Sequence, residues 1–338
     1  MTNVVNNNWL TGITWNVSLP KPVLTAGGAV ASPTSQSIFA VSKDASTIVA
    51  YNYNQYWGYN AATGASLWNL TLNYQVNTNE EIQLAGVDDF LVWDPTAAAW
   101  NCYSINTGSL LWTTPSVASA PWATTWTVYY SETNDLNNLY ISAPDGVVRA
   151  FSLATGKLIW QSNAFASTEY PNNAIPYVYG NPILVGGNLY VYGAYSVGYQ
   201  INPVPRFAML VCINATTGSI TYALNGGVAP NAAANGYLLG SGVFDGNLYC
   251  LGKGPTSTTI AAQQQVGGSV LIQGSITDTS PASSDATLKV IYPNGVPAVS
   301  DANMSTWMDY LHMQNSTLLN NPPQCTGVPV TLTAVDPN

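Results

Sequence analysis

Carboxylates, cysteines and one histidine are the side chains of this sequence that could do acid–base, metal or nucleophilic chemistry, and all of them are scarce. The 338 residues include 16 Asp and Glu, 4 Cys and 1 His. The closest group of acids is Glu80, Glu81, Asp88 and Asp89. Their oxygens could bind calcium, but their spacing matches no EF-hand loop. We therefore interpret them as solvated turn acids and expect no metal site.

The cysteines and the histidine also fit no known reactive pattern. Cys102, Cys212, Cys250 and Cys325 match no zinc motif and include no adjacent pair. Packing is favoured for the first three, which occupy a small-residue position of the repeat described next, whereas Cys325 could be free or bridged. His312 has no second histidine and no G-x-S-x-G sequence to accompany it. We expect no catalytic and no cofactor-binding residue.

The elements that would position a site come from a pattern that occurs four times. A small residue lies five positions before a Thr-Gly pair, a short polar residue lies three before it, and an aromatic ring follows four after the Gly. The Thr, Gly and ring residues are Thr63, Gly64 and Trp68; Thr107, Gly108 and Trp112; Thr155, Gly156 and Trp160; and Thr217, Gly218 and Tyr222.

Each copy predicts a β-hairpin with the same packing. Glycine supplies the positive φ of a tight turn. The polar residue, which is Asn60, Ser104, Ser152 or Asn214, can hydrogen-bond the turn backbone. The ring can cover the neighbouring unit, since large aromatic side chains contribute most where two layers meet.

This pattern resembles the A-x-D-x-x-T-G-x-x-x-W repeat of the pyrroloquinoline-quinone-like (PQQ-like) β-propellers. That family contains quinoprotein alcohol dehydrogenases and outer-membrane assembly scaffolds. The resemblance covers about residues 9–260 and departs from the family at the Asp position, which is Asn or Ser in every copy. It implies an all-β propeller of four-stranded blades. In the dehydrogenases it also implies pyrroloquinoline quinone, calcium, a catalytic Asp and an adjacent Cys-Cys disulfide, and that disulfide signature is missing here.

The spacing of the repeats predicts about five blades within residues 1–262. Four blades run over about 20–72, 80–115, 120–162 and 170–224, and a degenerate fifth follows, with Thr256–Ala261 as its outer strand. Trp9–Trp15 carries Thr-Gly and a ring without preceding strands. Either Ile13–Ser18 closes the fifth blade, or further blades belong to the full-length protein, and we favour the second.

Residues 263–338 predict a partial immunoglobulin-like β-sandwich with one short helix. Gly267–Thr277 and Gly327–Val335 alternate like strands, whereas Ser284–Pro297 is irregular. A helix is expected over residues 301–313, where Met304, Trp307, Met308 and Leu311 form a stripe best explained by core packing. A propeller followed by such a module resembles archaeal surface proteins.

Composition restricts the partners and the location. Charged residues make up 7% and the net charge is −9, which disfavours nucleic-acid binding. No apolar run is long enough to span a membrane, and Met1–Trp9 is too polar for a signal peptide. We nevertheless expect an extracellular or cell-surface protein, because little charge and much Asn and Thr resemble secreted surface proteins, with any signal or anchor outside these residues.

Two functions remain open. The first is a noncatalytic binding scaffold that presents aromatic loops to a protein or a glycan. Its candidate contact residues are Tyr53, Tyr56, Trp57, Trp122 and Trp126. The second is a quinoprotein-like oxidoreductase that binds pyrroloquinoline quinone with calcium. The missing cysteine pair and the few acids favour the first.

Overall fold

The computed structural model describes most of the predicted repeat region and part of the chain after it. The described residues are 13–18, 37–52, 54–74, 81–84, 86–116, 131–142, 146–162, 177–178, 182–194, 208–225, 228–242, 246–262, 268, 270–311, 322–333 and 335. None of the helices in these segments has the length and apolar character needed to cross a membrane. Contacts divide the chain into two compact units. Unit 1 contains Met1–Arg206 and Ile213–Ile220, and unit 2 contains Phe207–Cys212 and Thr221–Asn338.

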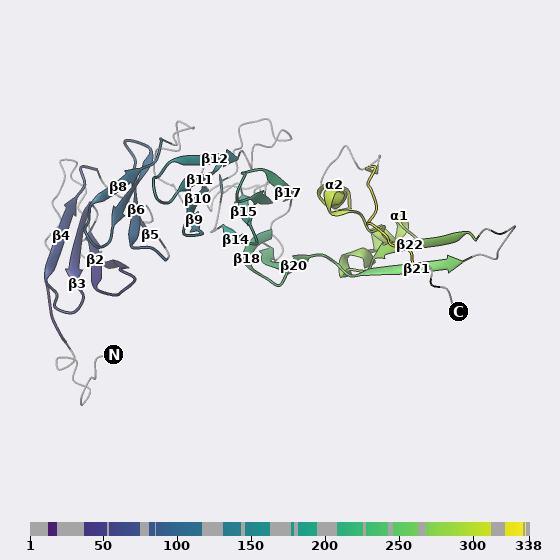
Figure 1. Ribbon diagram of the computed structural model, residues 1–338, viewed down its shortest axis with the longest axis horizontal. Coiled ribbons are helices and arrows are strands. Elements are labelled where there is room, and N and C mark those ends of the chain that lie inside the picture. Colours follow the sequence, from purple (N-terminus) through teal and green to yellow (C-terminus); the bar gives the residue numbers. More distant parts are fainter. Residues whose placement is uncertain are drawn as a thin grey trace, which may run out of the picture. The chain divides into compact units, whose positions relative to one another are not determined.

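Unit 1 contains a series of antiparallel sheets in which each strand pairs with the next one along the chain (Figure 1). The first sheet contains β1 (Ser37–Val41), β2 (Thr47–Asn52), β3 (Gln55–Asn60) and β4 (Ser66–Thr71). The second contains β5 (Glu81–Gln83), β6 (Asp89–Asp94), β7 (Ala99–Ser104) and β8 (Leu110–Thr113). The third contains β9 (Ser131–Asn134), β10 (Asn138–Ser142), β11 (Val148–Ser152) and β12 (Leu158–Ser162). The four-stranded repeats predicted from the sequence are confirmed in these three sheets.

The fourth sheet has an additional short strand, and the division between the two units passes through it. Its strands are β13 (Tyr177–Val178), β14 (Ile183–Val185), β15 (Asn188–Ala194), β16 (Ala208–Asn214) and β17 (Ile220–Asn225). They follow the order β13, β15, β16, β17, with β14 also paired to β15.

The fifth sheet contains β18 (Val228–Ala234), β19 (Tyr237–Gly242) and β20 (Leu248–Gly252). The prediction that Thr256–Ala261 forms its outer strand is wrong. That segment is β21 (Thr256–Ala262), and it pairs over its whole length with β22 (Ile272–Asp278). Gly254-Pro255 replaces the Thr-Gly turn here, and the Pro255 carbonyl accepts the backbone N–H of Thr279 instead of closing a hairpin back onto β20.

The C-terminal part contains short helical elements packed around Trp307. They are the 3₁₀ turns η3 (Pro281–Ser284) and η4 (Asp301–Asn303) and the helices α1 (Ala286–Ile291) and α2 (Met304–Leu311). A small core joins Leu288 of α1, Trp307 and Tyr310 of α2, and the intervening Val296 and Val299. The predicted core stripe is therefore confirmed at Trp307, and also at Leu311, which packs against this core. It is wrong at Met304, which lies at the start of α2 and is exposed.

Two sequence predictions in this region are corrected. Ser284–Pro297 is not irregular throughout, because the Asp285 carboxylate accepts the N–H groups of Thr287 and Leu288 and so caps α1. The alternating segment 327–335 forms no strand among the described residues 322–333, where Gly327 makes one isolated bridge to Val299. Pro329 cannot donate to a sheet, and Val330 and Leu332 are exposed. The immunoglobulin-like sandwich stays a prediction.

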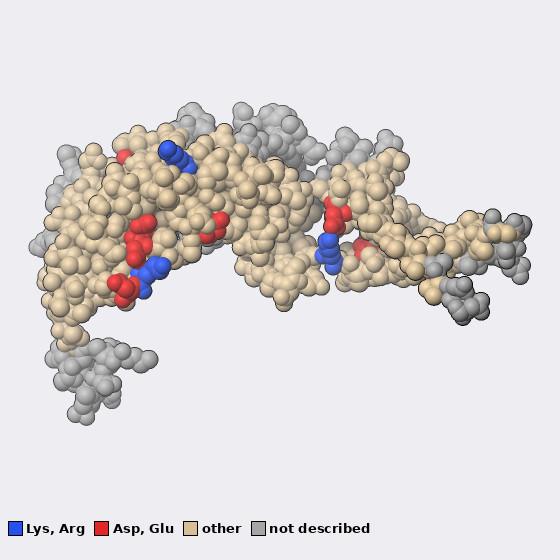
Figure 2. Space-filling model, viewed as in Figure 1, with Lys and Arg blue, Asp and Glu red and all other residues tan. Residues whose placement is uncertain are grey.

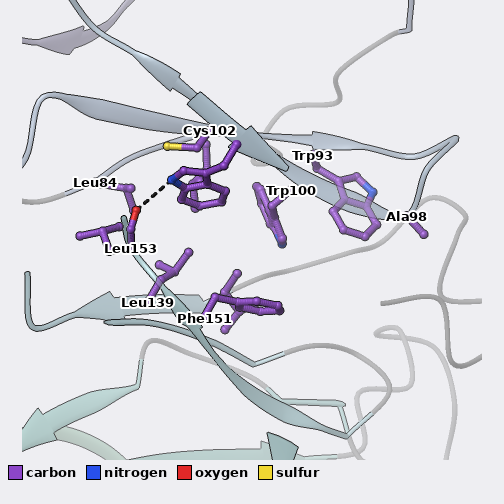
Figure 3. Close-up of a cluster of buried hydrophobic side chains, with 11 residues drawn as sticks. Leu84, Trp93, Ala98, Trp100, Cys102, Leu139, Phe151 and Leu153 are labelled. Carbon is purple, nitrogen blue, oxygen red and sulfur yellow. Dashed lines mark hydrogen bonds between the residues drawn. The ribbon is translucent and has the colours of Figure 1, made fainter. Parts of the chain in front are cut away.

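Successive sheets of unit 1 are held together by apolar cores. One core joins residues of the first and second sheets, including Tyr56 and Phe90. The next joins the second and third sheets. In it Trp100 and Cys102 on one side meet Leu139 and Phe151 on the other (Figure 3). Because both faces of the second sheet are covered, its central strands β6 and β7 are almost entirely buried.

Candidate functional site

The four Thr-Gly turns have one geometry. Their glycines, which we call the turn glycines (Gly64, Gly108, Gly156 and Gly218), have φ values of 73°, 67°, 66° and 75°. Each donates its backbone N–H to the carbonyl of the polar residue four positions earlier, at 2.8 to 2.9 Å. The side-chain oxygen of Asn60 accepts the N–H groups of Ala62 and Thr63 at 3.0 Å, and Asn214 does the same for Thr216 and Thr217. The predicted positive-φ turn is confirmed, as is capping by the two asparagines.

The tryptophan after each of the first three turns reaches the following sheet. The indole N–H of Trp68 donates to the carbonyl of Ile105 at 3.0 Å, that of Trp112 to Leu153 at 2.8 Å, and that of Trp160 to Ala215 at 3.0 Å. Figure 3 shows the Leu153 bond as a dashed line. Trp15 makes the same contact with Ala61 at 2.9 Å. We call Trp15, Trp68, Trp112 and Trp160 the docking tryptophans, and each acceptor lies three residues before a turn glycine.

The docked rings leave no room for a side chain at the turn glycines, in addition to the positive φ that favours glycine there. A Cβ on Gly64 would lie 2.7 Å from the Trp15 ring, and one on Gly218 would lie 2.7 Å from the Trp160 ring. Likewise, Trp68 would meet a Cβ on Gly108, and Trp112 would meet one on Gly156. The prediction that the ring covers the neighbouring unit is therefore confirmed for Trp68, Trp112 and Trp160. Tyr222 lies in β17 and is half-buried.

Several of the described carboxylates stabilise turns. In the β1–β2 turn, hydrogen bonds from the Ser42 hydroxyl and the Ser46 N–H lower the pKa of Asp44 to about 2. In the β9–β10 turn, burial alone would raise the pKa of Asp135. The N–H groups of Asn138 and Asn137 outweigh that effect, so the pKa lies below its usual range.

The predicted acidic group is only partly described. Glu80 and the side chain of Glu81 lie outside the described residues. The Asp88 carboxylate accepts the backbone N–H of Lys43 at 2.6 Å, which joins turns of the first two sheets. Burial raises the pKa of the neighbouring Asp89, and the charge of Asp88 adds to this effect. Within the described segments, His, Cys, Asp and Glu form no group of three or more that could hold a metal ion. Figure 2 shows how few charged side chains the visible face carries.

The aromatic contact residues are corrected where the structure describes them. Tyr56 and Trp57 lie in β3 rather than in a loop, and both rings are buried, so neither offers an exposed contact. A run such as QYWGYN places successive side chains on opposite faces of a strand, and here both faces are covered. Tyr53, Trp122 and Trp126 lie outside the described residues.

The packing prediction for the cysteines is right for two of three. Cys102 and Cys212 are buried, and burial raises the pKa of the Cys102 thiol far above its ordinary value. Cys250 is exposed, so packing does not explain it in this sheet. Its sheet lacks, among the described residues, the outer strand that covers the equivalent position elsewhere. Cys325 is half-buried and unbridged, and His312 lies outside the described residues.

A row of exposed aliphatic side chains on the outer strands was not predicted from the sequence. Leu67, Leu111 and Ile159, which we call the outer row, each directly precede a docking tryptophan. They are 48%, 48% and 49% exposed. Leu110 and Leu158, one position earlier, are also exposed. The signal was present in the sequence as an aliphatic residue at the same place in three repeats.

Comparison with known proteins identifies the repeat. Residues 11–254 match a family model described as outer membrane protein assembly factor BamB. The crystal structure of BamB from Moraxella catarrhalis is similar, with 15% identity and a TM-score of 0.37 over 72% of this chain and 76% of that one. A quinohemoprotein alcohol dehydrogenase, ADHIIG from Pseudomonas putida HK5, has 12% identity and a TM-score of 0.37 over 63% of this chain and 41% of that one. No curated protein matches the chain.

Proposed function

We propose that this chain, which belongs to the PQQ-repeat family whose model is described as outer membrane protein assembly factor BamB, is a noncatalytic binding scaffold at the cell surface. Its partner is a protein or a glycan bound on the outside of the repeat sheets. A protein partner fits the outer row best, because its side chains are aliphatic.

The outer row is the observation that carries this proposal. Single exposed aliphatic residues are ordinary, but here one recurs at the same position of three consecutive repeats with nearly equal exposure. The strands that bear it, β4, β8 and β12, contain no charged residue. They are also the last strands of their sheets. Natural edge strands are usually protected by charge or proline. Unprotected edges that carry apolar side chains suit a partner that adds a strand or covers the row.

The docking geometry supports a rigid scaffold. Each of the first three sheets is fixed to the next by a ring that contacts a turn glycine and donates to a backbone carbonyl, and Trp15 makes the same contact with the first sheet. Each residue of the outer row is the sequence neighbour of a docking tryptophan, so its backbone position is fixed by the docking. A partner that bound the row would therefore meet a preformed surface, with little ordering cost on binding.

A quinone oxidoreductase of this family would need a group of calcium ligands, and the described carboxylates form no such group. Asp44 and Asp135 accept hydrogen bonds from the N–H groups of their own turns, and Asp88 accepts one from Lys43. These hydrogen bonds hold the three carboxylates in turns and give the oxidoreductase alternative no support.

The test of the scaffold is site-specific photo-crosslinking on the source cells. A photoreactive phenylalanine analogue replaces Leu111, and the matched control replaces Thr107, an exposed turn residue of the same repeat. We expect position 111, and not 107, to give a discrete adduct that disappears when Leu67 and Ile159 are both changed to Lys. Equal labelling at both positions, or no adduct at either, would overturn the proposal.

The alternative is tested on the purified chain with pyrroloquinoline quinone and calcium. Saturable quenching of tryptophan fluorescence together with dye-linked alcohol oxidation would replace the scaffold with an oxidoreductase. We expect neither. Localisation is tested by protease treatment of intact cells, which should digest the chain if it lies at the surface.

A further inference from the structure

The fifth sheet exposes a face and an edge that are covered in the first three sheets. There, the third strand pairs with a fourth, as β3 does with β4. Within the described residues β20 pairs with β19 alone, because the chain continues into β21. No other strand of the described residues occupies the outer edge of β20, which could therefore accept one.

The strand pairing of the first three sheets indicates which residues a fourth strand beside β20 would need. In the first three sheets, the small residue of the third strand lies opposite the docking tryptophan of the fourth. The pairs are Gly58 with Trp68, Cys102 with Trp112, and Ala150 with Trp160. Cys250 occupies this small position in β20 and pairs with Leu239 of β19, as Cys102 pairs with Leu91. The strand that completes the fifth sheet should therefore place a large ring opposite Cys250.

The side chains around Cys250 also lack their usual cover. The register of β19 with β20 places Tyr237, Leu239, Leu248 and Cys250 on one face of the sheet. Tyr237 is 51% exposed, Leu239 39% and Leu248 77%. By contrast, Leu91 and Cys102 on the corresponding face of the second sheet are fully buried against the third sheet. This apolar face is of the kind that accepts another sheet.

Trp15 is a docking tryptophan for which the described residues contain no sheet of its own. It docks on Ala61 and Gly64 of the first sheet as Trp68 docks on the second. Yet residues 13–18 belong to no strand. Ile13 and Val17, which flank the ring at alternate positions, are exposed. This segment has the ring that β20 lacks.

We propose that residues 13–18 of one copy of this chain add to β20 of a second copy as its fourth strand, with Trp15 opposite Cys250. The register of the other sheets then pairs Val17 with Leu248, and Ile13 with Leu251 beyond the bulge that follows the small residue. Val17 and Leu248 are both exposed, whereas exposed Ile13 meets the half-buried Leu251. The first sheet of one copy, which carries the docked Trp15, would cover the exposed face of the other copy's fifth sheet.

The association is head-to-tail. Each copy contributes its Trp15 segment to one neighbour and its β20 edge to another, so the contact joins different surfaces and can extend beyond a pair. This inference does not depend on the outer row or on its partner, and its experiments measure contacts between copies.

Disulfide trapping tests the register. One chain carries Val17→Cys and a second, of different mass, carries Leu248→Cys, and both carry Cys250→Ala and Cys325→Ser. Both introduced cysteines replace exposed residues, so folding is not at risk. Directly opposed strand residues lie within disulfide reach. The control pairs Ile13→Cys with Leu248→Cys, whose positions would be about 13 Å apart in the proposed register. We expect a bridge between unlike chains for the first pair, formed at least about tenfold faster than for the control.

The native chain supplies a second readout. The rate of Cys250 modification by a maleimide should fall as chain concentration rises, whereas in a Trp15→Ala variant it should not. Three results would overturn the proposal. The first is a disulfide that forms only within one chain when that chain carries both Val17→Cys and Leu248→Cys, and the second is equally fast disulfide formation in the control pair. The third is a rate of Cys250 modification that does not depend on chain concentration, in a chain that sediments as a monomer.

Discussion

Replacing Gly156 with alanine tests whether docking of the tryptophan, and not the turn alone, requires glycine. Gly156 has a φ of 66°, and a Cβ there would overlap the Trp112 ring. That ring is buried and donates to the Leu153 carbonyl at 2.8 Å. It cannot move without losing the bond and disturbing the core that it shares with Leu139 and Phe151.

The expected loss has two parts. A non-glycine residue in the left-handed region costs about 1–2 kcal/mol. Forcing extra atoms into a packed core costs about 1–3 kcal/mol more. Gly156→Ala should therefore lower the free energy of unfolding by about 2–5 kcal/mol.

Gly187 provides the matched control for the first part. It has a φ of 75°, and no atom lies within 4 Å of the position that a Cβ would occupy, so Gly187→Ala should cost only the backbone term of about 1–2 kcal/mol. In a Trp112→Leu background, Gly156→Ala should also cost only that term, which gives a coupling of about 1–3 kcal/mol between the two positions. Urea unfolding followed by fluorescence and circular dichroism measures each value. Equal losses for Gly156→Ala and Gly187→Ala, with no coupling to Trp112, would refute the docking explanation.

Three further predictions concern single side chains. Asn60→Ala removes the acceptor of two backbone N–H groups and should cost about 1–2 kcal/mol, whereas Asn60→Asp keeps the acceptor and should cost less; equal losses in urea unfolding would contradict the capping role. The pKa of Asp44, at about 2, lies below its unfolded value of about 3.9, so its stabilisation is present above pH 4 and is lost as the pH falls toward 2. Carbon-detected NMR of the carboxyl group measures this titration, and a midpoint near 4 would contradict it. Buried Cys102 should react with a maleimide at least about a hundredfold more slowly than Cys250 in dilute solution, as judged by mass spectrometry; similar rates would mean that its sheet opens readily.

The repeats were predictable because their signals are local. A glycine with positive φ and an asparagine that caps the turn act within one hairpin, and the ring has a fixed place in the sequence of that hairpin, four residues after the glycine. The short helix was also predictable, since Trp307 and Leu311 lie on one helical face. These features require no knowledge of which sheets are neighbours.

The errors arose where the outcome depends on a distant partner. The burial of Tyr56 and Trp57 follows from cover on both faces of β3, which a run of aromatic residues does not reveal. The exposure of Cys250 follows from the pairing of β21 with β22 instead of with β20. The cap of α1 was different, because Asp285 before a helix-compatible segment was a local signal that the sequence analysis overlooked.

The same docking geometry explains why the proposed contact between copies involves the first and fifth sheets and not the central ones. Each docking tryptophan of β4, β8 and β12 is held between the small residue of its own sheet and the turn glycine of the next, so the second, third and fourth sheets each contact the outer strand of the sheet before them. In such an array the stabilising contacts are between nearest neighbours. The central sheets obtain both contacts from their own chain, as the buried Cys102 and Trp100 show. At the fifth sheet Cys250 and Leu239 are left exposed, while Trp15 docks on the first sheet from a segment that belongs to no strand. The described repeats thus carry two complementary surfaces, the exposed side chains around Cys250 and the segment that contains Trp15.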